Sequence, residues 1–178
     1  MSLAEGTYYI RSALSQRKSI DLEASQPLGR IIEYQFHRGN NQQWNVVRIS
    51  NDEYGIQSVA TGTNITAPNG NDATAYATRL NPDCNNVARW KIVRASPNGN
   101  NWVIRSVAFP NKVLDVTGSN QADVTPIIVY PYHGGANQQF TFTRSAMAKI
   151  QNEHLRSYSA TGGLHYRDKP AIEVMRKS

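Results

Sequence analysis

Short apolar runs alternate with clusters of Gly, Pro and Asn along residues 6–144. The runs are rich in β-branched and aromatic residues, a composition typical of β-strands. The residues between the runs are those that favour tight turns. No convincing helical spacing of apolar positions precedes residue 145. The pattern therefore predicts an all-β fold.

An internal repeat is the strongest feature of this pattern. Residues 31–44 read IIEYQFHRGNNQQW, and residues 127–140 read IIVYPYHGGANQQF. Aligned without a gap, the two segments share both Ile, the Tyr, the His, one Gly, one Asn and both Gln, and they end on Trp or Phe. A weaker copy ends at Trp90. Repetition at a fixed period indicates that one structural unit has been duplicated.

Each of the three units contains four predicted short strands. The predicted strands are 6–12, 19–22, 31–34 and 43–47 in the first unit, 54–59, 63–66, 73–80 and 88–93 in the second, and 102–107, 113–116, 127–130 and 139–143 in the third. A turn is predicted at 68–72. Twelve strands in a threefold repeat favour a closed body, because closure removes exposed sheet edges. We expect Trp44, Trp90 and Phe140 to be buried at equivalent places, one in each unit.

The closing triplets carry a family resemblance. They read QQW at 42–44, ARW at 88–90 and QQF at 138–140. This pattern resembles the Q-x-W repeats of the ricin B-type lectins over residues 6–144. The resemblance implies an all-β β-trefoil of three four-stranded repeats, with a lectin domain at 1–144 and a short C-terminal extension of unknown role at 145–178. Among its members, the chain is most similar to the fungal intracellular ones.

The resemblance also implies two sugar-binding sites. The family uses an Asp, an aromatic residue, an Asn and a Gln in each site, and two recurring His and two bordering Gly complete our candidate set. The expected carbohydrate-binding residues are Asp21, Tyr34, His37, Gly39, Asn41 and Gln42 in the first repeat, and Asp115, Tyr130, His133, Gly135, Asn137 and Gln138 in the third. The family often has Trp in place of the Tyr, and often Gln two residues earlier, where this chain has Ile32 and Ile128.

These residue types suit a hexose. A carboxylate accepts hydrogen bonds from neighbouring hydroxyls, and an amide both donates and accepts. A Tyr ring offers a flat surface to the C–H face of the sugar, which is larger in galactose than in glucose. The alternative is structural: each Asp and Asn stabilises a turn, and each His bonds to its own backbone. The second repeat has Thr66, Leu80 and Val87 at the expected Asp, Tyr and Asn positions, so we expect it not to bind sugar.

Charge and cysteine content narrow the function classes. The net charge of +6 is spread over the chain without a dense basic run, which argues against a nucleic-acid partner. The chain lacks an apolar run long enough for a membrane span, and its N-terminus does not read as a secretory signal, so we expect a cytoplasmic protein.

Cys84 is alone and is expected to be an inert thiol. No catalytic, metal-binding or cofactor-binding motif is present, so we expect no enzyme.

The sequence thus predicts a multivalent, agglutinating lectin for galactose- or N-acetylgalactosamine-containing glycans and glycoproteins, with a defensive role, acting as a monomer or homodimer. The alternative is a β-trefoil protease inhibitor, which would present one rigid loop and would not need two matching polar clusters. Residues 146–150 could begin a short helix, and residues 145–178 could pack on the barrel, mediate a dimer or form an appendage.

Overall fold

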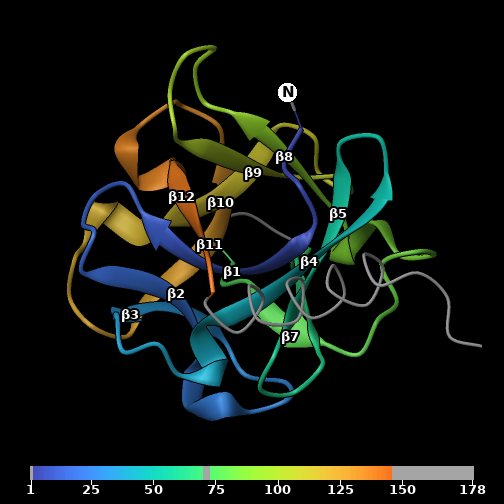
Figure 1. Cartoon of the computed structure of the whole chain (residues 1–178), viewed down its shortest axis with the longest axis horizontal. Helices are drawn as coiled ribbons and strands as arrows, with labels where there is room; N and C mark the ends of the chain where they lie inside the picture. Colours follow the sequence, from blue (N-terminus) through green and yellow to red (C-terminus); the bar gives the residue numbers. More distant parts are fainter. Residues whose placement is uncertain (1, 70–72, 146–178) are drawn as a thin grey trace, which may run out of the picture.

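The structure, a computed structural model, describes residues 2–69 and 73–145 (Figure 1). Within these residues it contains β-strands and single-turn 3-10 helices, and no α-helix. The strands are β1 (Gly6–Ser12), β2 (Lys18–Leu22), β3 (Ile31–Gln35), β4 (Gln43–Ser50), β5 (Glu53–Ser58), β6 (Asn64–Thr66), β7 (Tyr76–Thr78), β8 (Trp90–Arg94), β9 (Trp102–Ser106), β10 (Lys112–Val116), β11 (Thr125–Pro131) and β12 (Phe140–Arg144). The 3-10 turns are η1 (Glu23–Ser25), η2 (Asn40–Gln42), η3 (Asn86–Ala88), η4 (Thr117–Ser119) and η5 (Ala136–Gln138).

Six strands close into a barrel. Antiparallel pairing runs from β1 to β4, β5, β8, β9 and β12, and β12 pairs back with β1. Each repeat contributes its first and last strand to this ring. Because the ring is complete, none of these six strands leaves an open sheet edge. The predicted closed body is confirmed.

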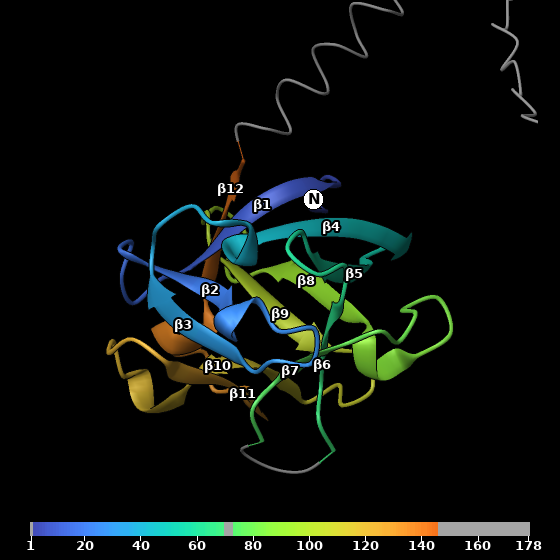
Figure 2. The same cartoon turned by 90° about the horizontal axis from the view of Figure 1, so that it is seen from below.

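The remaining strands form three hairpins, β2–β3, β6–β7 and β10–β11, that cover one end of the barrel. The hairpins are joined to each other by β3–β11 pairing and by the isolated bridges Arg30–Tyr76 and Thr74–Ile128. Figure 2 shows β1 and β4 on one side of the body, and β7, β10 and β11 on the other. Barrel and hairpins together form the predicted β-trefoil.

The three aromatic residues that end the repeats fill the core. Trp44, Trp90 and Phe140 are each 0% exposed, as predicted. The indole N–H of Trp44 donates to the carbonyl of Ile20 at 3.1 Å, and that of Trp90 donates to the carbonyl of Ile65 at 2.9 Å. These bonds tie the last strand of a repeat to its hairpin, and they identify Ile20 and Ile65 as equivalent positions.

The structure corrects one predicted strand. Residues 73–80 were expected to form a strand, but β7 covers only Tyr76–Thr78. The preceding Ala75 instead connects two other hairpins: its N–H donates to the carbonyl of Ile127, and its carbonyl accepts from the N–H of Ile31, each at 2.8 Å. The turn expected at 68–72 lies partly outside the described residues. The helix expected at 146–150, like most of the proposed extension, lies wholly outside them.

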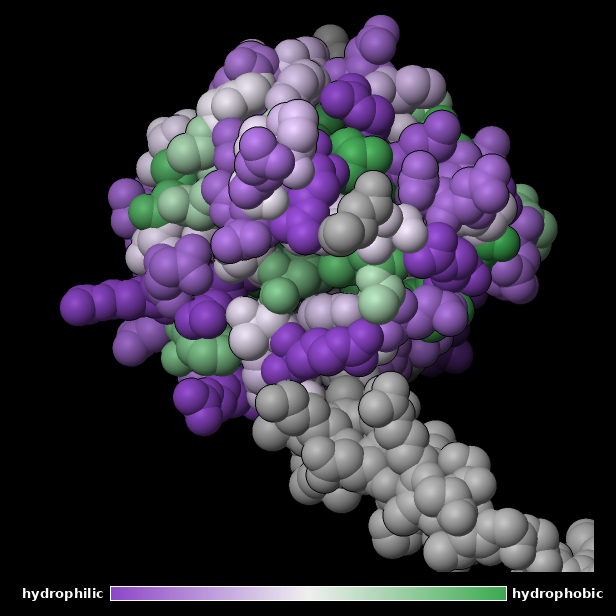
Figure 3. Space-filling model, turned by 45° about the horizontal axis from the view of Figure 1, so that its top comes forward, coloured by the Kyte–Doolittle hydropathy of each residue, from purple (hydrophilic) through white to green (hydrophobic). Residues whose placement is uncertain are grey.

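The surface in Figure 3 is mostly hydrophilic, with hydrophobic residues in small separate patches. Within the described ranges, the structure contains no helix long and apolar enough to cross a bilayer.

Candidate functional sites

Two aspartates occupy equivalent positions on the hairpins of the first and third repeats. Asp21 lies in β2 opposite Ile32, and Asp115 lies in β10 opposite Ile128. Their exposed fractions are only 3% and 2%. Both carboxylates therefore lie at the bottom of a polar cluster. We call these groups the first cluster (Asp21, Tyr34, His37, Gly39, Asn41 and Gln42) and the third cluster (Asp115, Tyr130, His133, Gly135, Asn137 and Gln138).

The glutamine of the first cluster is fully buried behind its aspartate. The Nε2 atom of Gln42 donates to Asp21 Oδ2 and to the carbonyl of Gln35, both at 2.9 Å. Its Oε1 atom accepts from the backbone N–H groups of His37 and Arg38 at 2.9 and 3.2 Å. Since an amide side chain has two N–H donors and about two acceptor positions, the hydrogen bonds of Gln42 are complete. Gln42 positions the carboxylate and the loop, and it has no free group for a ligand.

Gln138 repeats this arrangement in the third cluster. It donates to Asp115 Oδ2 at 2.8 Å and to the carbonyl of Pro131 at 2.9 Å. It accepts from the N–H groups of His133 and Gly134 at 2.8 and 3.1 Å. Both glutamines were expected to bind sugar directly, and the structure assigns them a positioning role because they are 0% exposed and fully bonded.

An asparagine holds the other oxygen of each aspartate. Asn41 Nδ2 donates to Asp21 Oδ1 at 2.8 Å, and Asn137 Nδ2 donates to Asp115 Oδ1 at 2.9 Å. The 3-10 turns η2 and η5 present these side chains, because each turn contains the Asn-Gln pair. Asn and Gln thus approach the same carboxylate from one short segment.

The histidine of each cluster is held between a glycine and the aspartate. The N–H of Gly39 donates to His37 Nδ1 at 3.0 Å, and His37 Nε2 lies 3.3 Å from Asp21 Oδ2. Because Nδ1 accepts a hydrogen bond, the neutral imidazole carries its proton on Nε2, which faces the carboxylate. In the third cluster, the corresponding distances from His133 are 3.2 Å to the N–H of Gly135 and 3.4 Å to Asp115 Oδ2.

The two glycines are required by this close packing. A Cβ atom at Gly39 would lie 2.7 Å from His37 Cε1 and 2.8 Å from Asn41 Oδ1. At Gly135 the same construction gives 2.7 Å to His133 Cε1 and 2.5 Å to Asn137 Oδ1. The glycines thus act by leaving room for the neighbouring His and Asn side chains.

Each tyrosine forms an aromatic wall beside its histidine. The rings of Tyr34 and His37 are 6.0 Å apart at an interplanar angle of 73°, and those of Tyr130 and His133 are 6.1 Å apart at 76°. Tyr130 is 37% exposed and Tyr34 is half-buried. Both rings are therefore accessible next to a buried carboxylate.

The carboxylates retain limited capacity for a ligand. Asn41, Gln42 and His37 occupy three of roughly four acceptor positions on Asp21, so about one remains, on Oδ1. Hydrogen bonds from two neighbouring sugar hydroxyls would therefore need an acceptor on another side chain as well. Burial raises the pKa of the Asp21 carboxyl, opposed by the hydrogen bond from Gln42, and burial likewise raises the pKa of Asp115.

The third cluster opens into a surface pocket of about 440 Å³. Besides the cluster residues and Ile128, three residues of η4 line this pocket: Thr117, Gly118 and Ser119. Sequence reasoning missed this turn, although Thr-Gly-Ser directly follows the strand that carries Asp115. Gly118 has a φ of +59°, a conformation that favours glycine. The first cluster has Ala24 at this place, also at positive φ (51°), so the two clusters have different rims.

The second repeat lacks the cluster. Thr66 follows Ile65 as Asp21 follows Ile20, so Thr66 occupies the aspartate position. The pairing of Asn64 with Thr78 matches that of Ser19 with Tyr34, which places Thr78 at the tyrosine position. Assigning Leu80 to that position was wrong, because the hairpin of this repeat has a different register from the one expected.

A hydrogen bond of 2.7 Å between the hydroxyls of Thr66 and Thr78 replaces the Asp-centred network. Val87 stands at the asparagine position and Ala88 at the glutamine position, so no side-chain amide is available there.

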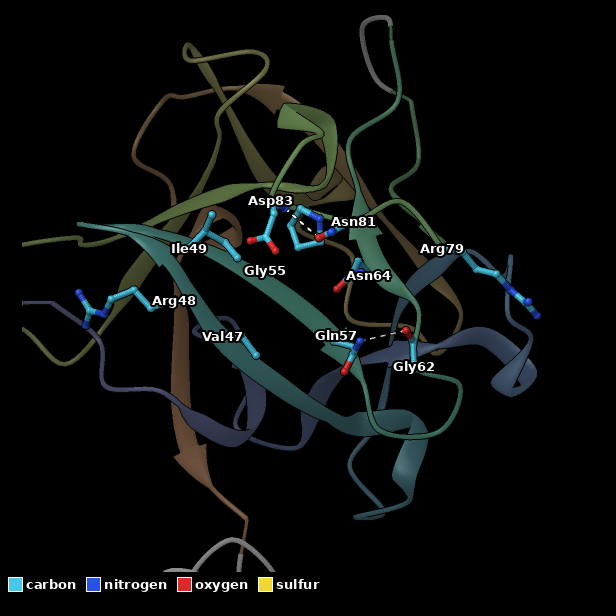
Figure 4. A pocket seen from close by; sticks show the side chains of 11 residues that line it. Val47, Arg48, Ile49, Gly55, Gln57, Gly62, Asn64, Arg79, Asn81 and Asp83 are labelled. Carbon is cyan, nitrogen blue, oxygen red and sulfur yellow. Dashed lines mark hydrogen bonds between the residues drawn. The ribbon is translucent and has the colours of Figure 1, made fainter.

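A different hollow, of about 520 Å³, lies beside β5 in the second repeat (Figure 4). It forms where Gly55 replaces a larger residue, Tyr9 or Val103, of the other repeats. Figure 4 shows Asn64 and Asp83 next to Gly55, whereas Arg79 points away from them. None of the Asp21 or Asp115 cluster residues lines this hollow.

Other reactive groups are sparse in the part of the chain that the structure describes. It contains no group of three or more His, Cys, Asp or Glu side chains arranged to hold a metal ion. Cys84 is exposed on the loop before η3.

Comparison with known proteins gives a consistent result. The family model described as "Ricin-type beta-trefoil lectin domain-like" matches residues 40–130. The Rhizoctonia solani agglutinin is 26% identical, with a TM-score of 0.70, and the match covers 82% of this chain and 99% of the agglutinin. The Macrolepiota procera ricin B-like lectin, solved in complex with lactose, is 26% identical with a TM-score of 0.68, and the match covers 82% of this chain and all (100%) of that lectin.

The designed threefold-symmetric protein ThreeFoil shares the fold, with a TM-score of 0.72 at 23% identity over 79% of this chain and 99% of the design. No curated protein matches this chain in sequence.

Proposed function

Because this chain belongs to the ricin-type β-trefoil lectin-like family, we propose that it is a lectin that binds galactose- or N-acetylgalactosamine-containing glycans through the first and third clusters. The observation that carries the proposal is the duplicated network around Asp21 and Asp115. Five side-chain or backbone hydrogen bonds recur around each Asp-Gln pair, with closely similar distances. A network this similar in two repeats fixes two carboxylates in one geometry.

The chemistry of each cluster fits a hexose. The free acceptor position of the Asp accepts a hydrogen bond from a sugar hydroxyl, and the Asn Oδ1 is a second acceptor in the same cluster. The His Nε2–H lies beside the carboxylate, where a sugar oxygen can share it, while the ring of Tyr34 or Tyr130 meets the sugar C–H face. The axial hydroxyl of galactose leaves one ring face with more contiguous C–H groups, which is why we favour galactose over glucose. The lectin acts by recognition alone, without a chemical step.

The lactose complex of the Macrolepiota lectin supports this choice, since lactose ends in a galactose residue. Within the described ranges, no observation specifically favours the protease-inhibitor alternative.

Calorimetry on Asp21→Ala, Asp115→Ala and the double variant tests the proposal. Loss of a charged acceptor should weaken binding at the altered cluster by roughly 1.5–3 kcal/mol, so each single variant should bind lactose at about half the stoichiometry. The double variant should show no measurable binding. Maltose, a disaccharide that ends in glucose where lactose ends in galactose, serves as the control sugar. Unchanged lactose affinity in a folded double variant would show that the clusters are not the binding sites.

A further inference from the structure

An arginine follows each buried core aromatic by four residues and lies over an aromatic ring of the barrel. The guanidinium carbon of Arg48 is 5.2 Å from the ring centroid of Tyr54, that of Arg94 is 4.0 Å from Trp102, and that of Arg144 is 5.1 Å from Tyr8. Stacking of this kind stabilises the cation and restricts the side chain before any ligand arrives. The stacking depends on pairing between neighbouring strands, so it is not evident from the sequence alone.

Two of the three arginines border one pocket. Arg94 and Arg144 line a hollow of about 450 Å³ that also includes Tyr8, Trp102 and Phe142. Phe142 lies edge-to-face with Tyr8 at 5.7 Å and with Trp102 at 6.3 Å. The two stacked guanidinium groups therefore flank a row of three rings, with Phe142 in the middle.

The apolar surface of this pocket is specific to the third repeat. Phe142 is only partly buried. The residues at the same place in the other repeats, Val46 and Ile92, are each 1% exposed. Substitution of an aliphatic residue by Phe thus leaves an accessible ring between two positive charges.

Hydrogen bonding distinguishes these arginines from the third. Arg48 donates to the carbonyls of Asn51 and Leu3 and to the hydroxyl of Ser2. Within the part of the chain that the structure describes, the Arg94 side chain has one hydrogen bond, to the carbonyl of Gly99 at 2.7 Å, and the Arg144 side chain has one, to that of Glu5 at 2.8 Å. A guanidinium has five N–H donors, so most donors of Arg94 and Arg144 remain available.

Among the described residues, no carboxylate is paired with either of these charges. None of the residues lining the pocket is acidic, and neither Arg94 nor Arg144 forms an ion pair with another described residue. The polar rim is uncharged and consists of Ser2, Asn100 and Thr141. Two fixed cations without a counter-charge, beside an exposed ring, form a receptor for an anion attached to an apolar face.

We propose that this pocket binds a sugar that carries a carboxylate or a sulfate group. The anionic group accepts hydrogen bonds from the free N–H groups of one guanidinium, hydroxyl oxygens of the sugar accept from the other, and the C–H face of the sugar packs on Phe142 between them. Asn100 and Thr141 are placed to bond with the remaining hydroxyls. The pocket shares no lining residue with the first or third cluster, so this binding is independent of the neutral-sugar function proposed above.

The probes are galacturonate and galactose 6-sulfate, titrated into the full chain with and without excess lactose. Trp102 borders the pocket, whereas Trp44 and Trp90 are fully buried, so a change in tryptophan fluorescence reports on this site. Arg94→Gln and Arg144→Gln should each weaken binding of the anionic probe by about tenfold or more. Arg48→Gln is the matched control. It removes the same charge from the third of the stacked arginines, and it should change the affinity by less than about twofold.

Equal weakening by Arg48→Gln, or full affinity in both other variants, would overturn the proposal. If lactose binds and the anionic sugars do not, the neutral-sugar function stands and this inference fails. If the anionic sugars bind and lactose does not, this inference stands and the neutral-sugar function fails.

A salt series on the unaltered protein covers the case in which a variant does not fold. Affinity for the anionic probe should fall several-fold between roughly 50 and 500 mM salt, and an affinity independent of salt would contradict the proposal. Stronger binding of one probe identifies the group that the pocket prefers.

Discussion

Gln138 illustrates how one side chain can organise a site without facing solvent. Its amide connects Asp115, the end of β11 and the loop at His133 through four hydrogen bonds. Gln138→Leu should therefore lower the free energy of unfolding by roughly 1–3 kcal/mol, because buried polar groups are left without partners. It should also abolish sugar binding at the third cluster while the first cluster remains active.

Urea denaturation and calorimetry measure the two effects. The exposed Gln121 provides the control: Gln121→Leu should change neither quantity. A Gln138→Leu variant with parental stability would show that the network contributes little to the fold.

Glu33 is a second buried residue with an unusual environment. It stands where the third repeat has Val129, it is 1% exposed, and neither carboxyl oxygen makes a hydrogen bond. Burial raises its pKa from 4.5 to about 7, and the charge of Lys18 opposes this only in part. Because the folded-state pKa lies above the unfolded one, the protonated form is favoured by folding. Its contribution to stability is complete below about pH 4.5 and is lost as the pH rises through about 7.

We therefore expect unfolding to require less denaturant at pH 8 than at pH 5. Glu33 should lower the free energy of unfolding by a few kcal/mol between these two pH values. Asp21 and Asp115 have raised pKa values and act in the same direction, so the comparison must be made against a variant. Glu33→Val should be more stable than the parent at pH 8 and should show a much smaller loss between the two pH values. If the Glu33→Val variant loses as much stability between pH 5 and pH 8 as the parent does, Glu33 is not the cause of the pH dependence.

The loops that follow β3 and β11 each contain a glycine whose substitution has a testable effect. Gly39 has a φ of −63°, which any residue can adopt, so Gly39→Ala should affect the site only through the contacts of its Cβ with His37 and Asn41. Displacing His37 should weaken sugar binding at the first cluster by about tenfold, which corresponds to ~1.4 kcal/mol.

Gly134 provides the opposite case. It has a φ of +78°, a Cβ there would meet only Tyr132, at an ordinary contact distance of 3.7 Å, and the equivalent Arg38 already adopts 64°. Gly134→Ala should therefore cost about 1 kcal/mol of stability with little loss of sugar affinity. The prediction fails if the two alanine variants affect binding equally in calorimetry.

At the level of elements, the hydrophobic pattern was sufficient to predict the repeat, the twelve strands and the buried aromatic residues. It predicted these well because each repeat ends on a large residue that must be buried. It could not predict the register of the second hairpin, where Thr78 rather than Leu80 lies at the tyrosine position. Register depends on pairing between strands, and this repeat lacks the polar motif that would have revealed it.

Candidate site residues were easier to find than their roles. Residue type indicated that Asp21, Asn41 and Gln42 act together, but the burial of Gln42 and the hydrogen bond from Gly39 to His37 depend on three-dimensional packing. The sequence places Glu33 in a strand but does not indicate its burial, because an isolated charge in a strand does not reveal which face it occupies.

For the whole molecule, the important fact is that the two clusters belong to different hairpins of one threefold body. A shallow site for one sugar is expected to bind at about millimolar to tens of micromolar affinity. Two such sites on separate lobes can engage two glycan chains, which raises the avidity for a glycan-covered surface by about 10²–10⁴. We therefore predict that the protein agglutinates glycan-bearing cells, even as a monomer.

Removal of either Asp21 or Asp115 should sharply reduce agglutination, whereas binding of a soluble monovalent sugar should fall by only about half in stoichiometry. Cell agglutination titres, together with light scattering to establish the oligomeric state, provide the test. If monomeric single-site variants agglutinate as well as the parent, cross-linking within one chain is not the mechanism.

The pairing of β1 with β12 has a consequence for how the chain reaches its fold. Tyr8 is the register partner of Arg144, so the barrel is completed by residues from opposite ends of the described chain. During synthesis, β1 leaves the ribosome before β12, and the edge of β1 that pairs with β12 stays open until β12 emerges. Such long-range closure slows folding to about milliseconds to seconds, and it makes the nascent chain a substrate for chaperones that shield open strand edges.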